Sequence, residues 1–67
     1  MIVLNGAPAN GHDGSTILAL LDALGVDAAA RGVAVAVGDE VVPRAEWPIT
    51  RLADGARVEV LTAMQGG

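Results

Sequence analysis

The stretch VAVAVGDEVVP at residues 33–43 decides the fold of this 67-residue chain. Residues 33–37 are all apolar. Such a run is typical of an inner strand that is covered on both faces or that carries small residues on a thinly covered side. Gly38-Asp39 predicts a tight turn, after which residues 40–42 pair back. Pro43 ends the returning strand because proline has no N–H to donate to a ladder. The stretch therefore predicts a β-hairpin.

A second hairpin is predicted at the start of the chain. Residues 1–4 are apolar, and the Asn5-Gly6 pair that follows them is a strong short-range hairpin signal. Residues 7–9 are expected to return as an edge strand, because Pro8 has no N–H to donate to a neighbouring strand. The polar, glycine-rich residues 10–14 then predict a loop.

One amphipathic helix is predicted after this loop. Ser15-Thr16 is expected to cap it, and Gly25 is expected to end it. Its apolar residues recur at i, i+3, i+4 and i+7, which predicts one buried face. That face consists of Ile17, Leu20, Leu21 and Leu24. A second, shorter helical turn is expected over residues 28–31, with Asp27 as its N-cap and Gly32 as its terminator.

The C-terminal part predicts an irregular connection and a last strand. Trp47 is expected to be a buried anchor within residues 45–48, because a large aromatic side chain contributes much apolar area to a small core. A turn at Asp54-Gly55 leads to a strand over residues 57–63. Strand alternation places Val58 and Val60 on the core face. The opposite face carries Arg57, Glu59 and Leu61.

These elements predict a single α+β domain over residues 1–67, with a mixed sheet packed against one main helix. Residues 63–67 are expected to form a flexible tail, since Gly66-Gly67 has little preference for any structure. We expect Leu61 to be the centre of a small exposed apolar patch beside this tail. Glu59 is expected to help orient a docking partner there.

The composition excludes several classes of function. The chain has no cysteine and no lysine, so it has no disulfide, thiolate zinc site or Schiff-base amine. A net charge of −4 and a single aromatic residue argue against binding to nucleic acid. Its longest apolar runs are far shorter than the roughly 18 residues of a membrane span, so no membrane association is expected. The start of the chain has no basic segment of a signal peptide, and a cytoplasmic location is expected.

No catalytic residue and no metal site is predicted, and the chain is not expected to be an enzyme. His12 has no second candidate ligand at metal spacing and is expected to be a solvated loop residue. Ser15 and Thr16 are better explained as caps than as nucleophiles. Gly66-Gly67 is the remaining chemical feature. The α-carboxylate of Gly67 is ionised and a poor electrophile, and two residues without side chains would let it enter a narrow activating site.

The whole chain resembles the sulfur carrier proteins of thiamine biosynthesis, the ThiS family. The resemblance lies in residues 33–47, VAVAVGDEVVPRAEW, and residues 51–67, RLADGARVEVLTAMQGG. Its most specific parts are the VVPR-x-x-W run from 41 to 47, Asp54-Gly55 before the last strand, and the terminal Gly66-Gly67. Two positions depart from the family pattern. The hairpin turn reads Gly38-Asp39 where the family usually has Asn-Gly, and Gln65 stands where a small residue is common.

The resemblance implies a ubiquitin-like β-grasp fold and a cycle that other proteins run. An ATP-dependent, E1-like activating enzyme would adenylate the Gly67 carboxylate, and sulfur from a persulfide would convert it to a thiocarboxylate. Thiazole synthase would then receive the sulfur for the thiazole ring of thiamine. Gly66, Gln65 and Met64 would be the residues by which partners recognise the tail. The carrier would bind no cofactor itself, since the partner uses the ATP, and it is expected to be a monomer when free.

Two other interpretations remain open at this point. The small subunit of molybdopterin synthase shares the fold, the tail and the activation chemistry, although that family tends to be longer and lacks the VVPR-x-x-W run as a hallmark. A ubiquitin-like docking module with a merely flexible glycine end belongs to a different class. The mass of the chain from native cells separates a carrier from a docking module, because only a carrier exchanges an oxygen for sulfur at its C-terminus.

Overall fold

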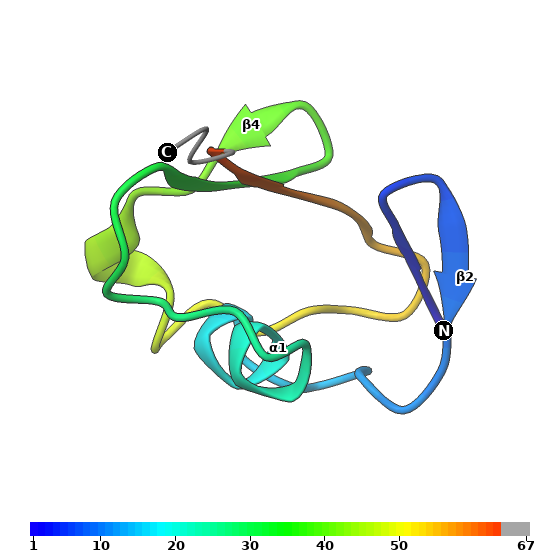
Figure 1. Cartoon of the computed structure of the whole chain (residues 1–67). Helices are drawn as coiled ribbons and strands as arrows, with labels where there is room; N and C mark the ends of the chain where they lie inside the picture. Colours follow the sequence, from blue (N-terminus) through cyan, green and yellow to red (C-terminus); the bar gives the residue numbers. More distant parts are fainter. Residues whose placement is uncertain (64–67) are drawn as a thin grey trace.

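A computed structural model describes residues 1–63, and within that range a five-stranded mixed sheet is covered on one face by one α-helix (Figure 1). The elements are β1 (Ile2–Leu4), β2 (Ala7–Ala9), α1 (Ile17–Ala23), β3 (Val33–Val37), β4 (Glu40–Val41), the 3-10 helix η1 (Arg44–Glu46) and β5 (Arg57–Thr62). The sheet order is β2-β1-β5-β3-β4. The central strand β5 runs parallel to β1 and antiparallel to β3. The predicted α+β class, with one helix on a mixed sheet, is confirmed.

Both predicted hairpins form. β1 pairs antiparallel with the edge strand β2, and β3 pairs antiparallel with β4. Of the two interpretations of the apolar run in β3, the second is correct. Val35 is buried, whereas Ala34 on the opposite face is exposed, so the strand is covered on one face and carries small residues on the other.

The helix is capped by one residue of the predicted pair, and its buried face is shorter than expected. Thr16 alone is the N-cap, with its Oγ1 accepting a hydrogen bond from the Ala19 N–H at 3.1 Å. Ile17, Leu20 and Leu21 are fully buried. The prediction that Leu24 belongs to the buried face is wrong. Leu24 is the C-cap and is 40% exposed, because the chain leaves the helical path there.

The predicted second helical turn over residues 28–31 is also wrong. The chain makes a turn there in which Asp27 Oδ1 accepts from the Ala29 N–H at 2.9 Å. This bond is the capping contact that the sequence predicts for Asp27, but no helix continues from it, and Gly32 leaves the helical region at a φ of 81°. A short helix forms instead within the connection expected to be irregular. Pro43 precedes η1 with a φ of −60°, a value suited to entering a helical turn.

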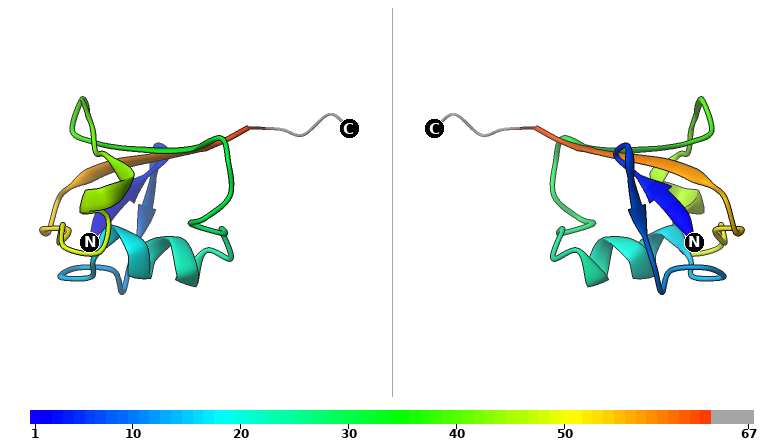
Figure 2. Two further views of the ribbon diagram at one scale, coloured as in Figure 1. Left: turned by 90° about the vertical axis from the view of Figure 1, so that its left-hand side faces the viewer. Right: turned by 90° about the vertical axis from the view of Figure 1, so that its right-hand side faces the viewer.

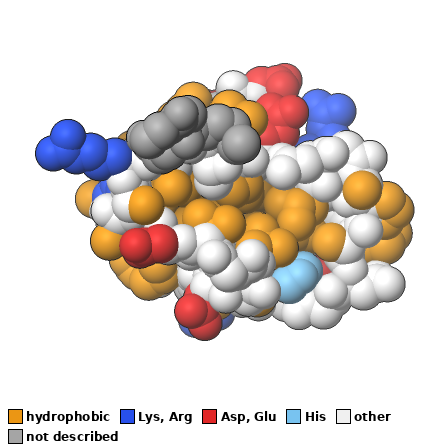
Figure 3. Space-filling view, viewed as in Figure 1, with side chains coloured by type: hydrophobic (Ala, Val, Ile, Leu, Met, Phe, Trp, Pro, Cys, Tyr) orange, Lys and Arg blue, Asp and Glu red, His pale blue; other side chains and the backbone are white. Residues whose placement is uncertain are grey.

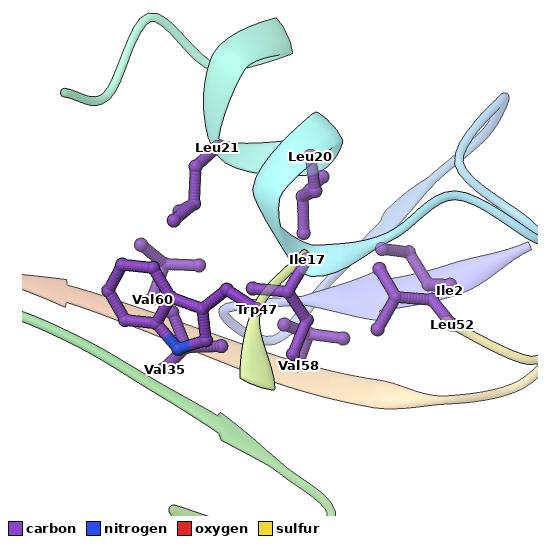
Figure 4. Close-up of a cluster of buried hydrophobic side chains, with 9 residues drawn as sticks. All are labelled: Ile2, Ile17, Leu20, Leu21, Val35, Trp47, Leu52, Val58 and Val60. Atoms are coloured by element: carbon purple, nitrogen blue, oxygen red, sulfur yellow. The ribbon is translucent and has the colours of Figure 1, made fainter. Parts of the chain in front are cut away.

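The core lies between the sheet and α1, and nine side chains of the described residues form it (Figure 4). They are Ile2, Ile17, Leu20, Leu21, Val35, Trp47, Leu52, Val58 and Val60. In the space-filling view, apolar side chains fill the opening between sheet and helix, and charged groups lie around its margins (Figure 3). None of the helices in the part of the chain that the structure describes has the length and hydrophobicity to cross a membrane.

The α-amino group of Met1 ties the start of the sheet to two loops. It donates to the carboxylates of Asp13, at 2.7 Å, and of Asp54. The hydrogen bond to Asp13 contributes most, and that to Asp54 next, to raising the pKa of the Met1 amino group above its ordinary value. In turn, the hydrogen bond from the amino group lowers the pKa of the Asp54 carboxyl. All three groups lie at the surface, so the surrounding water weakens this interaction.

Trp47 joins η1 to the core, as the sequence predicts. It is 2% exposed, and its Nε1 donates to the Val42 carbonyl at 3.0 Å. The Arg44 guanidinium lies 4.7 Å from the ring centroid and covers the outer side of the ring. The indole is therefore held by packing on one side, a cation on the other, and a hydrogen bond at its edge.

We predict that Trp47→Ala lowers the free energy of unfolding by about 3–5 kcal/mol, the cost of emptying a large buried site. Trp47→Phe is the matched control. It keeps an aromatic ring but loses the hydrogen bond to Val42, and it should cost roughly 1–3 kcal/mol. Urea unfolding of the three proteins measures both differences. A loss below about 1 kcal/mol for Trp47→Ala would contradict the buried position of the indole.

Candidate functional site

The last strand exposes one row of side chains on the sheet face that α1 does not cover. Val58 and Val60 are buried, whereas Leu61 is 64% exposed and Glu59 is exposed too. The predicted register of β5 is therefore confirmed. An exposed leucine has no significance by itself, so its neighbours on this face decide whether it belongs to a surface.

The strand register surrounds Leu61 with apolar neighbours. Leu61 is paired with Ala34 across β5 and β3, and Ala36 is paired with Val41 across β3 and β4. Paired residues share a sheet face, and so do residues two apart on one strand. Leu61, Ala34, Ala36 and Val41 thus form one strip, the open-face patch. Val41 is 74% exposed, so two large side chains stand at the ends of a floor of alanines.

The border of this patch is polar. Glu59 is paired with Ala36, and a shallow hollow of about 300 Å³ lies beside this pair. The hollow is lined in part by Arg57 and Asp39, so both signs of charge stand next to the apolar strip. An apolar centre with a charged rim is the usual composition of a docking surface for another protein.

On the β1 side, the end of β5 is held by a side chain. Asn5 Oδ1 accepts from the Val60 N–H at 2.8 Å, and Asn5 Nδ2 donates to the Val60 carbonyl at 3.3 Å. The backbone of Asn5 has a φ of 50°, in the left-handed region that asparagine tolerates better than most residues. Asn5 thus turns the β1–β2 hairpin and also contacts the strand that leads to the C-terminus.

On the β3 side, the end of β5 is held by the backbone of Gly32. Its carbonyl accepts from the Ala63 N–H at 2.9 Å. A Cβ atom at Gly32 would lie only 2.4 Å from the Cβ of Ala63, so this approach requires glycine. Both views in Figure 2 show the end of β5 (red) beside the connection that enters β3 (green).

The residues beyond Ala63 lie outside the part of the chain that the structure describes. Met64, Gln65, Gly66 and Gly67 carry the predicted modification and recognition roles, and those roles stay predictions. The structure does place the described site residues, Leu61 and Glu59, on the last strand before them.

The side chains considered for catalysis or metal binding are not brought together. Thr16 Oγ1 caps α1, and Ser15 donates its N–H to the His12 carbonyl. His12 is half-buried rather than fully solvated. Among residues 1–63, the structure shows no cluster of three or more His, Cys, Asp or Glu side chains that could hold a metal ion.

Two residues near the site have roles that the sequence does not predict. The local patterns indicate only a hairpin turn at Asn5 and only the end of a helical turn at Gly32. The contact between Asn5 and Val60 joins residues 55 positions apart, and no local pattern indicates it. The sole sequence signal is the presence of these turn residues, which predicts backbone shape but not a distant partner.

Comparison with known proteins agrees with this architecture. The model of the ThiS family matches residues 2–67. A relative from Thermus thermophilus, named sulfur carrier protein ThiS, is 40% identical over 67 residues, which is the full length of both chains. The crystal structure of a thiamine biosynthesis protein (ThiS) from Geobacter metallireducens superposes with a TM-score of 0.76 at 35% identity, covering 98% of this chain and 97% of the other. An NMR structure of a thiamine biosynthesis protein from the same organism gives a TM-score of 0.78 at 34% identity, over 98% of this chain and 86% of the other.

Proposed function

This chain belongs to the ThiS family of sulfur carrier proteins, and from that premise we propose that it carries sulfur as a thiocarboxylate on Gly67 for the thiazole ring of thiamine. The observation that carries the proposal is the family match over residues 2–67, which takes in the C-terminal Gly66-Gly67. The same match favours this assignment over the small subunit of molybdopterin synthase, and it also favours it over a plain docking module.

The chemistry of the carboxylate explains why activation is needed. An α-carboxylate has a pKa of about 3.3–3.7, so it is an anion at neutral pH and resists attack by a nucleophile. In the proposed first step, a Gly67 oxygen attacks the α-phosphorus of ATP and pyrophosphate leaves. The resulting acyl adenylate has AMP as a good leaving group. An E1-like partner enzyme binds the ATP, and this chain supplies only the carboxylate.

Sulfur enters in the next steps. A persulfide on a partner attacks the acyl carbon and displaces AMP, which gives an acyl disulfide. A second thiol of the partner then attacks the sulfur atom that belongs to the partner's own cysteine. The S–S bond of the acyl disulfide breaks, the thiocarboxylate leaves, and a disulfide remains on the partner. Thiazole synthase takes up the sulfur on its acceptor, and hydrolysis of the acyl–sulfur bond by water then regenerates the Gly67 carboxylate. The chain contains no cysteine, so it offers no internal thiol that could capture the activated group.

Docking would use a surface separate from the reacting group. The open-face patch, with Leu61 at one end and Glu59 at its border, lies on the strand that leads to the C-terminus. A partner that binds this patch would hold the body of the carrier while the terminal glycines enter its site. Met64 and Gln65 stand between the two in the sequence and would contact the entrance to that site.

We predict that deleting Gly67, or adding one residue after it, abolishes adenylation and leaves the fold intact. The terminal carboxylate is the only group in the proposed step that this chain provides. ATP–pyrophosphate exchange with the purified activating enzyme measures the reaction, and a thermal melt of each variant checks the fold. The sulfur carrier assignment fails if the truncated chain still supports exchange.

We predict that Leu61→Arg weakens binding to the activating enzyme by about 2 kcal/mol, roughly 30-fold, as loss of a central apolar anchor does. The free energy of unfolding should stay within about 0.5 kcal/mol, because the side chain is already exposed. Leu18→Arg is the matched control, since Leu18 is an exposed leucine on α1. Calorimetric titration and thermal melts of both variants decide the matter. Equal affinities for the two variants would remove Leu61 from the interface.

A further inference from the structure

The end of β5 is held on its β1 side by a side chain in place of a main-chain bond. Asn5 donates its N–H to the Val58 carbonyl at 2.9 Å, which continues the parallel ladder between the two strands. The next bond of a parallel ladder would join the Val60 N–H to the main-chain carbonyl of Asn5. The backbone turns away at Asn5, where φ is 50°, and the side-chain Oδ1 accepts from Val60 instead, at 2.8 Å.

The amide of Asn5 satisfies both main-chain groups of Val60, because its Nδ2 also donates to the Val60 carbonyl. A primary amide carries a donor and an acceptor on one carbon, so it can imitate a peptide unit. A carboxylate at this position could accept from Val60 but could not donate to it. The side chain thus extends the ladder by one rung toward the C-terminus after the main chain of β1 has turned.

The β3 side of the same segment is held by an approach that only glycine permits. The Ala63 N–H bonds to the Gly32 carbonyl, and a Cβ at Gly32 would lie 2.4 Å from that of Ala63. Gly25 also has a positive φ, but a Cβ added there would meet nothing within 4 Å. The requirement at Gly32 therefore concerns contact with the end of β5 as well as backbone shape.

The direction of this segment matters for the proposed function, on which this inference rests. Four residue steps separate Ala63 from Gly67, and they span at most about 14 Å even when fully extended. A partner that binds the open sheet face and receives Gly67 in a separate active site needs the face and the terminal carboxylate at a fixed distance and direction from each other. Misplacement of a reacting group by about 1 Å can reduce a rate by roughly 100-fold.

We propose that Asn5 and Gly32 are positioning residues, which hold the end of β5 from opposite sides and so set the direction in which Gly67 is delivered to the activating enzyme.

The test uses two variants that disturb the segment from opposite sides. Asn5→Gly removes the amide and suits the positive φ, so it changes the contact with Val60 without straining the turn. Gly32→Ala introduces the clash with Ala63. Gly25→Ala is the matched control for the second variant, because it brings a similar backbone penalty with no clash. The affinity for the activating enzyme and the kcat of ATP–pyrophosphate exchange are measured for each, at a temperature where melts show the protein folded.

The expected result is a kcat lowered about 10- to 100-fold for both variants, with the dissociation constant changed less than about twofold. Gly25→Ala should match the wild type in both quantities. A merely structural role would lower binding and turnover together, in line with the folded fraction, and that outcome overturns the proposal. An unchanged kcat in either folded variant also overturns it. A wild-type chain that supports no exchange refutes the proposed function and this inference with it.

One measurement on the wild type needs no variant to fold. The Nδ2 proton of Asn5 that is donated to the Val60 carbonyl should exchange with solvent at least about tenfold more slowly than the side-chain amide protons of the exposed Asn10, as hydrogen-bonded groups do. Exchange at the rate of Asn10 would show that the Asn5 side-chain amide does not hold β5, and it would overturn the proposal that Asn5 is a positioning residue.

Discussion

The position of β5 at the centre of the sheet is the constraint on which the rest of the structure depends. It pairs with β1 on one side and with β3 on the other, so it joins the N-terminal hairpin to the second hairpin. Its strict alternation sends Val58 and Val60 into the core and leaves Glu59 and Leu61 in solvent. A slip of one residue would reverse both faces at once, and the buried valines strongly oppose such a slip.

The small core explains the concentration of contacts around Trp47. With few large side chains available, one indole fills the space beneath α1 and next to the sheet (Figure 4). The VVPR-x-x-W run acts as one unit around it. Val42 accepts from the indole N–H, Pro43 ends the hairpin, and Arg44 covers the ring. Arg44 also donates from Nη2 to the Ala30 carbonyl at 2.8 Å, which ties the connection after α1 to the same anchor.

Under the proposed function, this arrangement would separate the docking surface from the reacting group. The open-face patch lies on paired strands, whose geometry is held by main-chain hydrogen bonds. The carboxylate that would be activated lies at the end of a short glycine segment, which can enter a partner's site because it has no side chains to exclude it. In such a design, the end of β5 links the two parts, and the contacts of Asn5 and Gly32 are found there.

Local patterns in the sequence determined most of the elements and the exposed face of the last strand. The two hairpins, the helix at residues 17–23 and the outward position of Leu61 follow from periodicity or turn chemistry within a few residues. The burial of Trp47 follows from its size and apolar surface in a chain with no other aromatic residue. The exposure of Leu24 and the turn at residues 28–31 were not predicted from these patterns. Helix propensity says little about the residue at which the chain must leave the helix in order to return to the sheet. Tertiary structure alone decided that Asn5 meets Val60 and that Gly32 meets Ala63. Those contacts depend on which strands become neighbours, and neighbouring strands are chosen by burial of the whole core rather than by any segment of the chain.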